Sequence, residues 1–262
     1  MTAATPYVSE LFIYPIKSLD RLQCDRVTLL ESGALQCDRT FAIFDQAGNF
    51  VNGKRNSKIH SLRSQFQLET NTLSLQIQGT SNTEAFNLVR EPEALNNWLG
   101  NYFGFPVEIK QNLEMGFPDD TVSPGATIVS TATLKVIASW YPKISVEDIR
   151  LRFRANIEIS GVPAFWEDRL FAATDETVNF QIGDVLFIGV NPCQRCVVVT
   201  RDPITGEAYP KFQKTFITKR QETLPEWTKR SQFNHFFRLA VNTRLSASEA
   251  GKVIQVGDQV VY

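Results

Sequence analysis

Residues 191–206 read NPCQRCVVVTRDPITG, and this stretch combines a loop, a short apolar segment and a turn. Pro192 and the close pair Cys193 and Cys196 predict a loop at the mouth of a strand. Residues Val197–Thr200 are all β-branched, and such side chains pack well on a pleated surface. A strand is therefore predicted over residues 196–200. The segment 202–206 begins with Asp-Pro and ends with a glycine, which predicts a hairpin turn. A thiol held by a rigid β scaffold is expected.

The thiol of Cys196 is the reactive group that this stretch presents most clearly. Arg195 adjoins it, and a neighbouring cation favours the thiolate over the neutral thiol, so we expect a lowered pKa for Cys196. A thiolate is the kind of ligand that a soft metal ion prefers. Cys196 is therefore a candidate metal ligand.

Three other interpretations of the C-x-x-C spacing stay open. The pair could be half of a zinc site with four ligands. The remaining ligands would have to come from residues that form no second close pair, namely Cys24, Cys37, His60 or His235. A thioredoxin-like redox pair normally opens a helix, whereas a strand is expected here. The third interpretation is two buried cysteines with a structural role only.

The first part of the chain has short segments of alternating polarity, separated by turn-forming residues. The expected strands are residues 7–14, 26–30, 40–45 and 73–77. An amphipathic helix is predicted to follow, because apolar residues from Leu95 to Tyr102 recur at helical spacing and Pro92 suits a first helical turn. Residues 116–125 are rich in Gly, Pro and Asp and predict a linker or an exposed loop. We accordingly expect one domain over residues 1–118 and a second over residues 119–262.

The second part of the chain opens with two predicted helices. Ser130-Thr131 precedes an apolar run, and residues 145–148 have a capping-box pattern. Strands are then expected to dominate, most clearly over residues 180–190, 196–200 and 252–261. Closure into a small barrel accounts for so many short strands. The predicted fold class is mainly β, of the α+β type, with an N-terminal β-barrel-like domain and a second β-barrel domain that has a few helices.

Composition excludes several classes of function. The chain of 262 residues has a formal net charge of -1, so no broad basic field exists to hold nucleic acid. No stretch approaches the roughly 20 apolar residues that cross a bilayer, so no membrane span is expected. Four cysteines are too few for a disulfide scaffold and suit a reducing compartment, so we expect a cytoplasmic protein.

Five polar residues stand out elsewhere in the chain. Lys17 and Ser18 directly follow the first strand, and Arg39 begins another. Arg154 and Asn156 are expected on one face of an extended segment by the strand period of two. A single cation at a strand end is usually solvated surface. Only convergence of these side chains on one place would make them a site.

Together these segments resemble the MOSC proteins, named for the C-terminal domain of molybdenum cofactor sulfurase. The resemblance is to the two-part form with an N-terminal β-barrel domain, as in the mitochondrial amidoxime-reducing component and its bacterial relatives. Its motifs agree in order and spacing over nearly the whole chain: Tyr14-Pro-Ile-Lys-Ser18, Asp38-Arg-Thr-Phe41, Phe153-Arg-Ala-Asn-Ile157, Cys193-Gln-Arg-Cys196 and Val256-Gly-Asp258.

The resemblance implies a molybdenum-pterin cofactor of the sulfite-oxidase-like form. Cys196 is then the metal ligand and the catalytic residue, and Arg195 holds the cofactor. The residues implied to contact the pterin and its phosphate are Lys17, Ser18, Arg39, Arg154 and Asn156. Relatives carry Asp-Thr-Ser at the start of a helix where this chain has Thr131-Ala132-Thr133, so the hydroxyls of Thr131 and Thr133 are the expected contacts there.

The implied activity is the reduction of small N-hydroxylated compounds by oxygen-atom transfer to the metal. Electrons have to come from a separate donor protein of the ferredoxin, cytochrome b5 or flavin reductase type. The alternative is a carrier that passes the molybdenum cofactor, or sulfur as a persulfide on Cys196, to another enzyme. The sequence of the loop does not separate these two functions.

Overall fold

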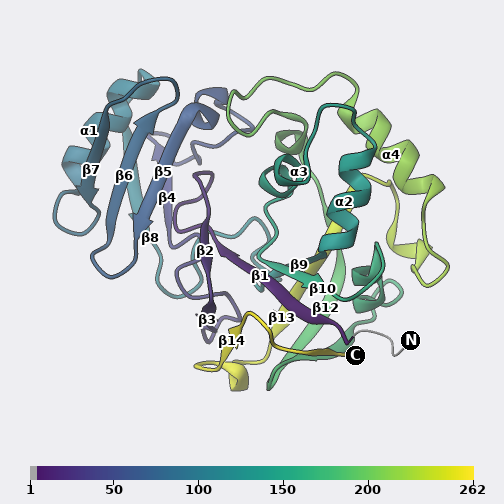
Figure 1. The fold of residues 1–262 in the computed structure, drawn as a ribbon. Helices are drawn as coiled ribbons and strands as arrows, with labels where there is room; N and C mark the ends of the chain where they lie inside the picture. Colours follow the sequence, from purple (N-terminus) through teal and green to yellow (C-terminus); the bar gives the residue numbers. More distant parts are fainter. Residues whose placement is uncertain (1–4) are drawn as a thin grey trace.

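The computed structural model describes residues 5–262 as a mainly β protein with an α-helical layer and a smaller lobe at one side (Figure 1). The largest sheet has the strand order β15-β11-β12-β13-β9-β10-β1-β2. Its strands are β1 (Tyr7–Ile13), β2 (Leu22–Cys24), β9 (Thr127–Ser130), β10 (Ile157–Ser160), β11 (Val178–Ile182), β12 (Val185–Gln194), β13 (Arg238–Leu245) and β15 (Val260–Val261). The predicted α+β class is confirmed.

This sheet closes on itself where β1 and β15, the first and last strands along the chain, come together. Tyr7 forms an antiparallel bridge with Gln259, the backbone N–H of Val8 donates to the carbonyl of Asp258 at 2.8 Å, and Val260 N–H donates to Pro6 at 2.8 Å. Buried apolar side chains, such as Ile128, Ile157 and Phe187, fill the interior. A closed sheet leaves few unpaired edge groups. The barrel predicted for the second half therefore includes a strand from the start of the chain.

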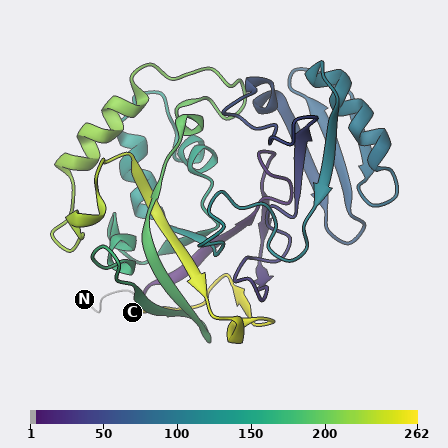
Figure 2. The same ribbon diagram turned by 180° about the vertical axis from the view of Figure 1, so that it is seen from behind.

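A separate lobe is formed by residues 41–111 (Figures 1 and 2). Strands β4 (Phe41–Asp45) and β8 (Val107–Gln111) pair with each other, and β5 (Leu62–Gln67), β6 (Thr72–Ile77) and β7 (Thr83–Asn87) form a second small sheet. A 3₁₀ helix, η1 (Ser57–Ser61), precedes β5, and helix α1 (Pro92–Phe103) follows β7. Leu95 and Leu99 of α1 are fully buried in the core of this lobe. The helix predicted here from apolar spacing is confirmed.

Helices cover the side of the barrel that adjoins the pocket described below. They are α2 (Thr131–Ser139), α3 (Val146–Phe153) and α4 (Phe212–Glu222), and a third core of buried apolar residues lies between them. The capping box predicted at the start of α3 is present, because Ser145 and Asp148 each bond the other's backbone N–H. Strands β3 (Arg26–Thr28) and β14 (Val253–Gln255) form a separate pair, and η2 (Trp166–Leu170), η3 (Val197–Thr200), η4 (Arg230–Gln232) and η5 (Ala247–Glu249) are 3₁₀ helices.

The strand predicted over residues 196–200 is wrong, because residues 197–200 form the 3₁₀ helix η3. Strand β12 is already paired on both sides, by β11 and β13, so no ladder position is free for this segment. The hydroxyl of Thr200 donates to the carbonyl of Val197 at 2.7 Å and closes the turn. Val199 is buried in the core between the helices. Tertiary packing has overridden the β propensity of three successive valines.

Three other predicted extended segments are interrupted. Residues 180–190 form two strands, β11 and β12, because Gly183 has a φ of +59° and turns the chain between them. Residues 252–261 likewise form β14 and β15 with a turn at Gly257. The segment around Arg152 is not extended, because α3 continues to Phe153. Glycine at a positive φ is the common cause of the two strand breaks.

No helix among residues 5–262 combines the length and the apolar composition needed to cross a membrane.

Gly189 in β12 lies against the backbone of η2, and an added Cβ would stand 1.7 Å from the carbonyl oxygen of Leu170. We predict that Gly189→Ala lowers the free energy of unfolding by about 1–3 kcal/mol or more, because backbone has to move. Denaturant unfolding measures the change. The matched control is Gly100→Ala in α1, where the nearest atom is 3.4 Å away. Alanine favours a helix interior by about 1 kcal/mol, so this control is expected to be stabilising, and equal effects of both changes contradict the packing described here.

Candidate functional site

A pocket of about 560 Å³ lies where the smaller lobe, the barrel and the helices meet. Its lining comes from five separate stretches of sequence, within residues 14–21, 52–63, 118–127, 151–156 and 193–203, together with Arg39 and Asn242. Seven of the nine residues singled out from the sequence line it, namely Lys17, Ser18, Arg39, Arg154, Asn156, Arg195 and Cys196. The chain therefore brings together in one cavity residues that are up to 179 positions apart.

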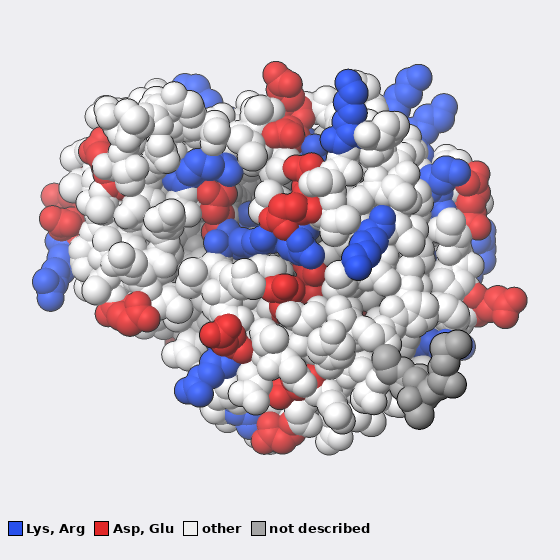
Figure 3. Space-filling model, in the orientation of Figure 1, with Lys and Arg blue, Asp and Glu red and all other residues white. Residues whose placement is uncertain are grey.

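The pocket is strongly basic although the whole chain has a net charge of -1. Nine Lys and Arg residues line it, against three Asp residues. Figure 3 shows Lys and Arg side chains gathered near the middle of one face, with acidic side chains around them. Positive charge concentrated in a cleft attracts anions much more effectively than the net charge of the molecule suggests.

Three of the lining residues have the left-handed backbone conformation that favours glycine. Ser18 has a φ of 74°, Arg39 of 51° and Arg154 of 52°. Arg154 adopts it as the residue that ends α3, and its N–H donates to the carbonyl of Arg150 at 3.0 Å. This conformation costs a residue with a side chain about 1–2 kcal/mol. The surrounding structure maintains the conformation at all three positions, and it determines the direction in which these side chains leave the backbone.

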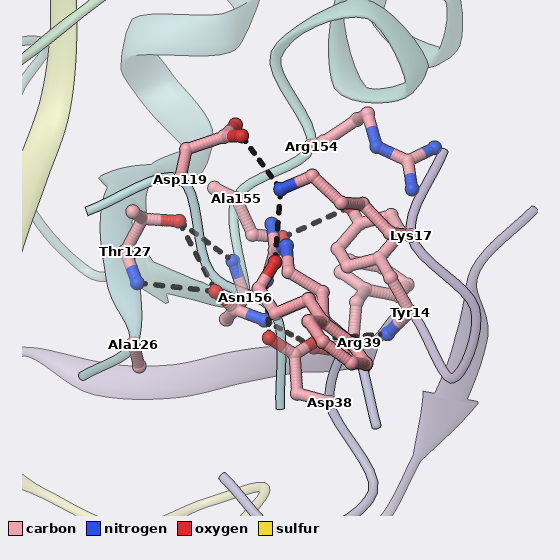
Figure 4. Close-up of polar contacts among 12 residues, drawn as sticks. Tyr14, Lys17, Asp38, Arg39, Asp119, Ala126, Thr127, Arg154, Ala155 and Asn156 are labelled. Atoms are coloured by element: carbon pink, nitrogen blue, oxygen red, sulfur yellow. Dashed lines mark hydrogen bonds and ion pairs between the residues drawn. The ribbon is translucent and has the colours of Figure 1, made fainter. Parts of the chain in front are cut away.

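Tyr14 lies between two of these cations (Figure 4). The guanidinium carbon of Arg154 is 4.0 Å from the centre of the tyrosine ring, and that of Arg39 is 5.1 Å from it. The hydroxyl of Tyr14 donates to the carbonyl of Ala155 at 3.2 Å, and burial raises the pKa of this hydroxyl. A ring face attracts a cation, so Tyr14 holds two like charges close together.

Lys17 contacts the segment that was predicted to be a linker. Its Nζ donates to the carbonyl of Phe117 at 2.8 Å and to Oδ1 of Asp119 at 2.6 Å (Figure 4). Burial lowers the pKa of Lys17, and Asp119 opposes that effect. Residues 118–121 and 123–125 line the pocket, so this segment forms one of its walls.

Asn156 uses its side-chain amide within the protein. Its Nδ2 donates to the carbonyl of Phe12 at 3.1 Å, and its Oδ1 accepts from the backbone N–H and the hydroxyl of Thr127, each at 3.2 Å. The residue is 2% exposed. Asn156 therefore joins β1 to β9 beside the pocket, a role that the sequence did not indicate.

Cys196 and Cys193 are both half-buried and both line the pocket. Cys196 lies directly before η3, and Cys193 lies in the last part of β12. Arg195, between them, donates from Nε to the carbonyl of Leu239 at 3.0 Å, and its guanidinium carbon lies 5.3 Å from the ring centre of Phe153. In the part of the chain that the structure describes, no three His, Cys, Asp or Glu side chains are grouped closely enough to hold a metal ion. The zinc interpretation of the C-x-x-C pair consequently has no partner ligands there.

The comparison with known domains covers both parts of the fold. Residues 126–261 match the MOSC domain, and residues 5–98 match the MOSC N-terminal beta barrel domain. The chain belongs to the MOSC family. The family predicted from the sequence motifs is confirmed.

Relatives of this MOSC protein have two kinds of name. It is 27% identical to mitochondrial amidoxime reducing component 2 of Bos taurus over 76% of this chain and 67% of that protein. It is likewise 27% identical to mitochondrial amidoxime-reducing component 1 of Homo sapiens, with the same coverage. Molybdenum cofactor sulfurase of Bos taurus is 24% identical over 82% of this chain, but the match spans only 29% of the sulfurase. The matches thus span about two thirds of the amidoxime-reducing components and less than one third of the sulfurase.

Thr131 and Thr133, predicted as site residues, do not line the pocket of this MOSC protein. Both hydroxyls are used in other contacts: Thr131 bonds Ser160 at 3.0 Å, and Thr133 donates to Oε2 of Glu167 at 3.0 Å. The start of α2 is therefore next to a buried carboxylate. Glu167 is 1% exposed, and its Oε1 has no hydrogen-bond partner in the structure.

Several pocket residues were missed in the sequence. His60, Arg63, Arg152 and Arg201 all line the cavity. They lie outside the motifs that resemble the family, and each is an ordinary polar residue in its local sequence. His60 and Arg63 come from the smaller lobe, so only the packing of this lobe against the MOSC domain brings them to the pocket.

Glu167 generates a prediction about pH. Burial raises the pKa of Glu167 to about 7 from an ordinary value of 4.5. The folded protein holds this proton more tightly than the unfolded chain, so its stabilising effect is present below pH 4.5 and is lost as pH rises through 7. The side chain of Glu167→Gln cannot ionise. We predict that the free energy of unfolding of this variant, relative to that of the wild type, increases by about 2 kcal/mol between pH 5 and pH 8.

Urea unfolding at both pH values measures this difference, and Glu31→Gln at an exposed position is the matched control. A pH profile of Glu167→Gln parallel to that of the wild type refutes the prediction.

Proposed function

We propose that this chain binds a molybdenum-pterin cofactor and that the thiolate of Cys196 is the protein ligand to the metal. The observation that supports it is the convergence of Cys196 with Lys17, Arg39, Arg154 and Arg195 in one pocket. A soft metal ion prefers a thiolate, and a phosphorylated group prefers Lys and Arg donors.

The charges of the pocket fit a bound anion. Five of its cations have carboxylate partners: Lys17, Arg21, Arg39, Arg63 and Arg152. Among the described residues, no carboxylate lies within ion-pair distance of the other four, Lys54, Arg154, Arg195 and Arg201. In addition, Nη2 of Arg195 is buried without a hydrogen-bond partner. A terminal phosphate brings about two negative charges and several acceptor oxygens, which Arg154 and Arg195 would complement.

The residues would divide the work as follows. Cys196 would hold the metal, and Arg195 and Arg154 would neutralise the anionic part of the cofactor. Lys17 and Arg39 would join them, while Ser18 would supply a hydroxyl. Tyr14 and Asn156 would position these groups, since their polar atoms are already bonded within the protein. When bound, the cofactor supplies two-electron chemistry and oxygen-atom transfer, and the protein supplies orientation and charge.

For the reaction, we propose the reduction of small N-hydroxylated compounds. The relatives named amidoxime-reducing components align with 76% of this chain, and an alignment of that extent has to include part of each domain. Such a reduction consumes two electrons, and we propose that a separate protein of the ferredoxin, cytochrome b5 or flavin reductase type delivers them.

A carrier function is the second candidate, because relatives named molybdenum cofactor sulfurase align with up to 82% of this chain. In that case the half-buried thiol of Cys196 would hold sulfur as a persulfide, or would hold the cofactor only temporarily. Both functions use the same pocket and the same thiol.

We predict that protein produced in a cofactor-synthesising host contains about one molybdenum per chain and that Cys196→Ala removes most of it. Inductively coupled plasma mass spectrometry gives the metal content, and pterin fluorescence after oxidation gives the cofactor content. The matched control is Cys193→Ala, which removes the neighbouring thiol of the same pocket. Equal loss of metal in both variants, or in neither, contradicts the assignment of Cys196.

We also predict that the molybdenum-loaded protein reduces benzamidoxime to benzamidine with reduced methyl viologen as an artificial one-electron donor. Substrate and product are separated by liquid chromatography, and Cys196→Ala is the negative control. The artificial donor removes the need for the physiological electron donor, so a missing partner cannot explain a negative result. No turnover by fully loaded protein rules out the reductase and favours the carrier function.

A further inference from the structure

A second group of polar residues in the same pocket has no part in the proposed cofactor site. His60 lies in η1, Arg63 in β5 and Arg201 directly after η3, and all three line the cavity. They bring the smaller lobe and the segment after Cys196 to one place. Arg154 belongs to the proposed cofactor site, where its guanidinium contacts the ring of Tyr14, and it lines the same cavity as these three residues.

The guanidinium of Arg63 is held firmly across the boundary between the two parts of the fold. Its Nη1 lies 3.2 Å from Oδ1 of Asp20. Its Nη2 donates to the carbonyl of His60 at 2.6 Å and to that of Pro203 at 3.4 Å. These contacts fix the orientation of the group before any ligand binds, which lowers the entropic cost of binding.

Arg201 is the cation of this group that lacks a counter-ion. Its Nη1 donates to the carbonyl of Gly206 at 3.2 Å, and its Nε is buried without a partner. Within residues 5–262 no carboxylate forms an ion pair with it, whereas Arg63 has Asp20. The neighbouring Arg152 likewise has Asp202, at 3.7 Å. One positive charge is therefore left over at this end of the pocket.

His60 completes the group with a neutral imidazole. Glycines border it closely, since an added Cβ at Gly53 would lie 2.6 Å from its Nε2 and one at Gly206 would lie 3.3 Å from its Cβ. Burial, together with the charges of Arg201 and Arg154, lowers the pKa of His60 to about 4. The imidazole is consequently uncharged at neutral pH, and its Nε2 has no hydrogen-bond partner in the structure.

We propose that His60, Arg63 and Arg201 form an anion subsite that binds a carboxylate group of the substrate while the cofactor occupies the part of the pocket around Cys196. Planar guanidinium groups held in fixed orientations match the geometry of a carboxylate, and the excess positive charge provides the attraction. This inference rests on the proposed function for the N-hydroxylated part of the substrate. It narrows the substrate class to N-hydroxylated compounds that also bear a carboxylate.

Isothermal titration calorimetry on the molybdenum-loaded protein tests the subsite without requiring turnover. Three probes are compared: benzamidoxime, 4-carboxybenzamidoxime and benzoate. The wild type is expected to bind 4-carboxybenzamidoxime about tenfold or more tightly than benzamidoxime at low ionic strength, since a bond to a charged group contributes at least that much. In Arg201→Gln this ratio falls close to one, and in Arg201→Lys, which keeps the charge, it is partly retained.

The matched control is Arg90→Gln, the same change at an exposed position outside the pocket, which is expected to keep the wild-type ratio. Molybdenum content separates the two anion sites: it stays at the wild-type level in Arg201→Gln if the subsite serves the substrate. Loss of molybdenum in that variant, or equal affinity of the wild type for the charged and uncharged probes, overturns the proposal. A third outcome is also informative. If benzoate binds in a way that depends on Arg201 but the protein does not reduce benzamidoxime, the anion subsite is supported and only the proposed reductase activity is rejected.

Discussion

Nine cationic side chains in one pocket repel one another, and the fold has to hold them together before any anion binds. Carboxylates in or beside the pocket offset part of this repulsion, as Asp38 does for Arg39 and Asp119 for Lys17. The ring of Tyr14 offsets more of it, because its face attracts the guanidinium groups of both Arg39 and Arg154. What remains without an ion-pair partner among the described residues is the charge of Lys54, Arg154, Arg195 and Arg201, and this remainder favours a bound anion.

The same constraint explains why so much of the chain takes part in the site. A single strand or helix could not present this many like charges on one face without losing its own stability. The cations come instead from loops and element ends in both parts of the fold, and backbone carbonyls hold several of them, as Leu19 does for Arg154 and Leu239 for Arg195. The left-handed conformations of Ser18, Arg39 and Arg154 indicate that these side-chain directions are maintained at a cost in local stability.

Sequence reasoning was most successful where local chemistry decides the structure. The helix at residues 92–103 and the capping box at Ser145 follow from the spacing and hydrogen-bonding capacity of neighbouring residues, and the motifs identified the family. It was wrong for the valines after Cys196, because the paired neighbours of β12 are not visible in a local pattern. His60 and Arg201 were missed for the same reason, since only the packing of one lobe on the other brings them together. The roles assigned to the site residues stay predictions.

Barrel closure also determines the order in which the strand pairs of the barrel can form. β1 pairs with β10 on one side, and its start meets the residues just before β15 on the other, so strands from the two ends of the chain meet in one sheet. During synthesis β2 follows β1 closely and can pair with one edge of it, but β10, the partner of its other edge, is made more than 140 residues later. Contacts between such distant segments are slow to form, and an unpaired strand can associate with other chains in the meantime. Until β10 is made, one edge of β1 therefore stays open to pairing with other chains, which does not happen in a protein whose neighbouring strands are consecutive.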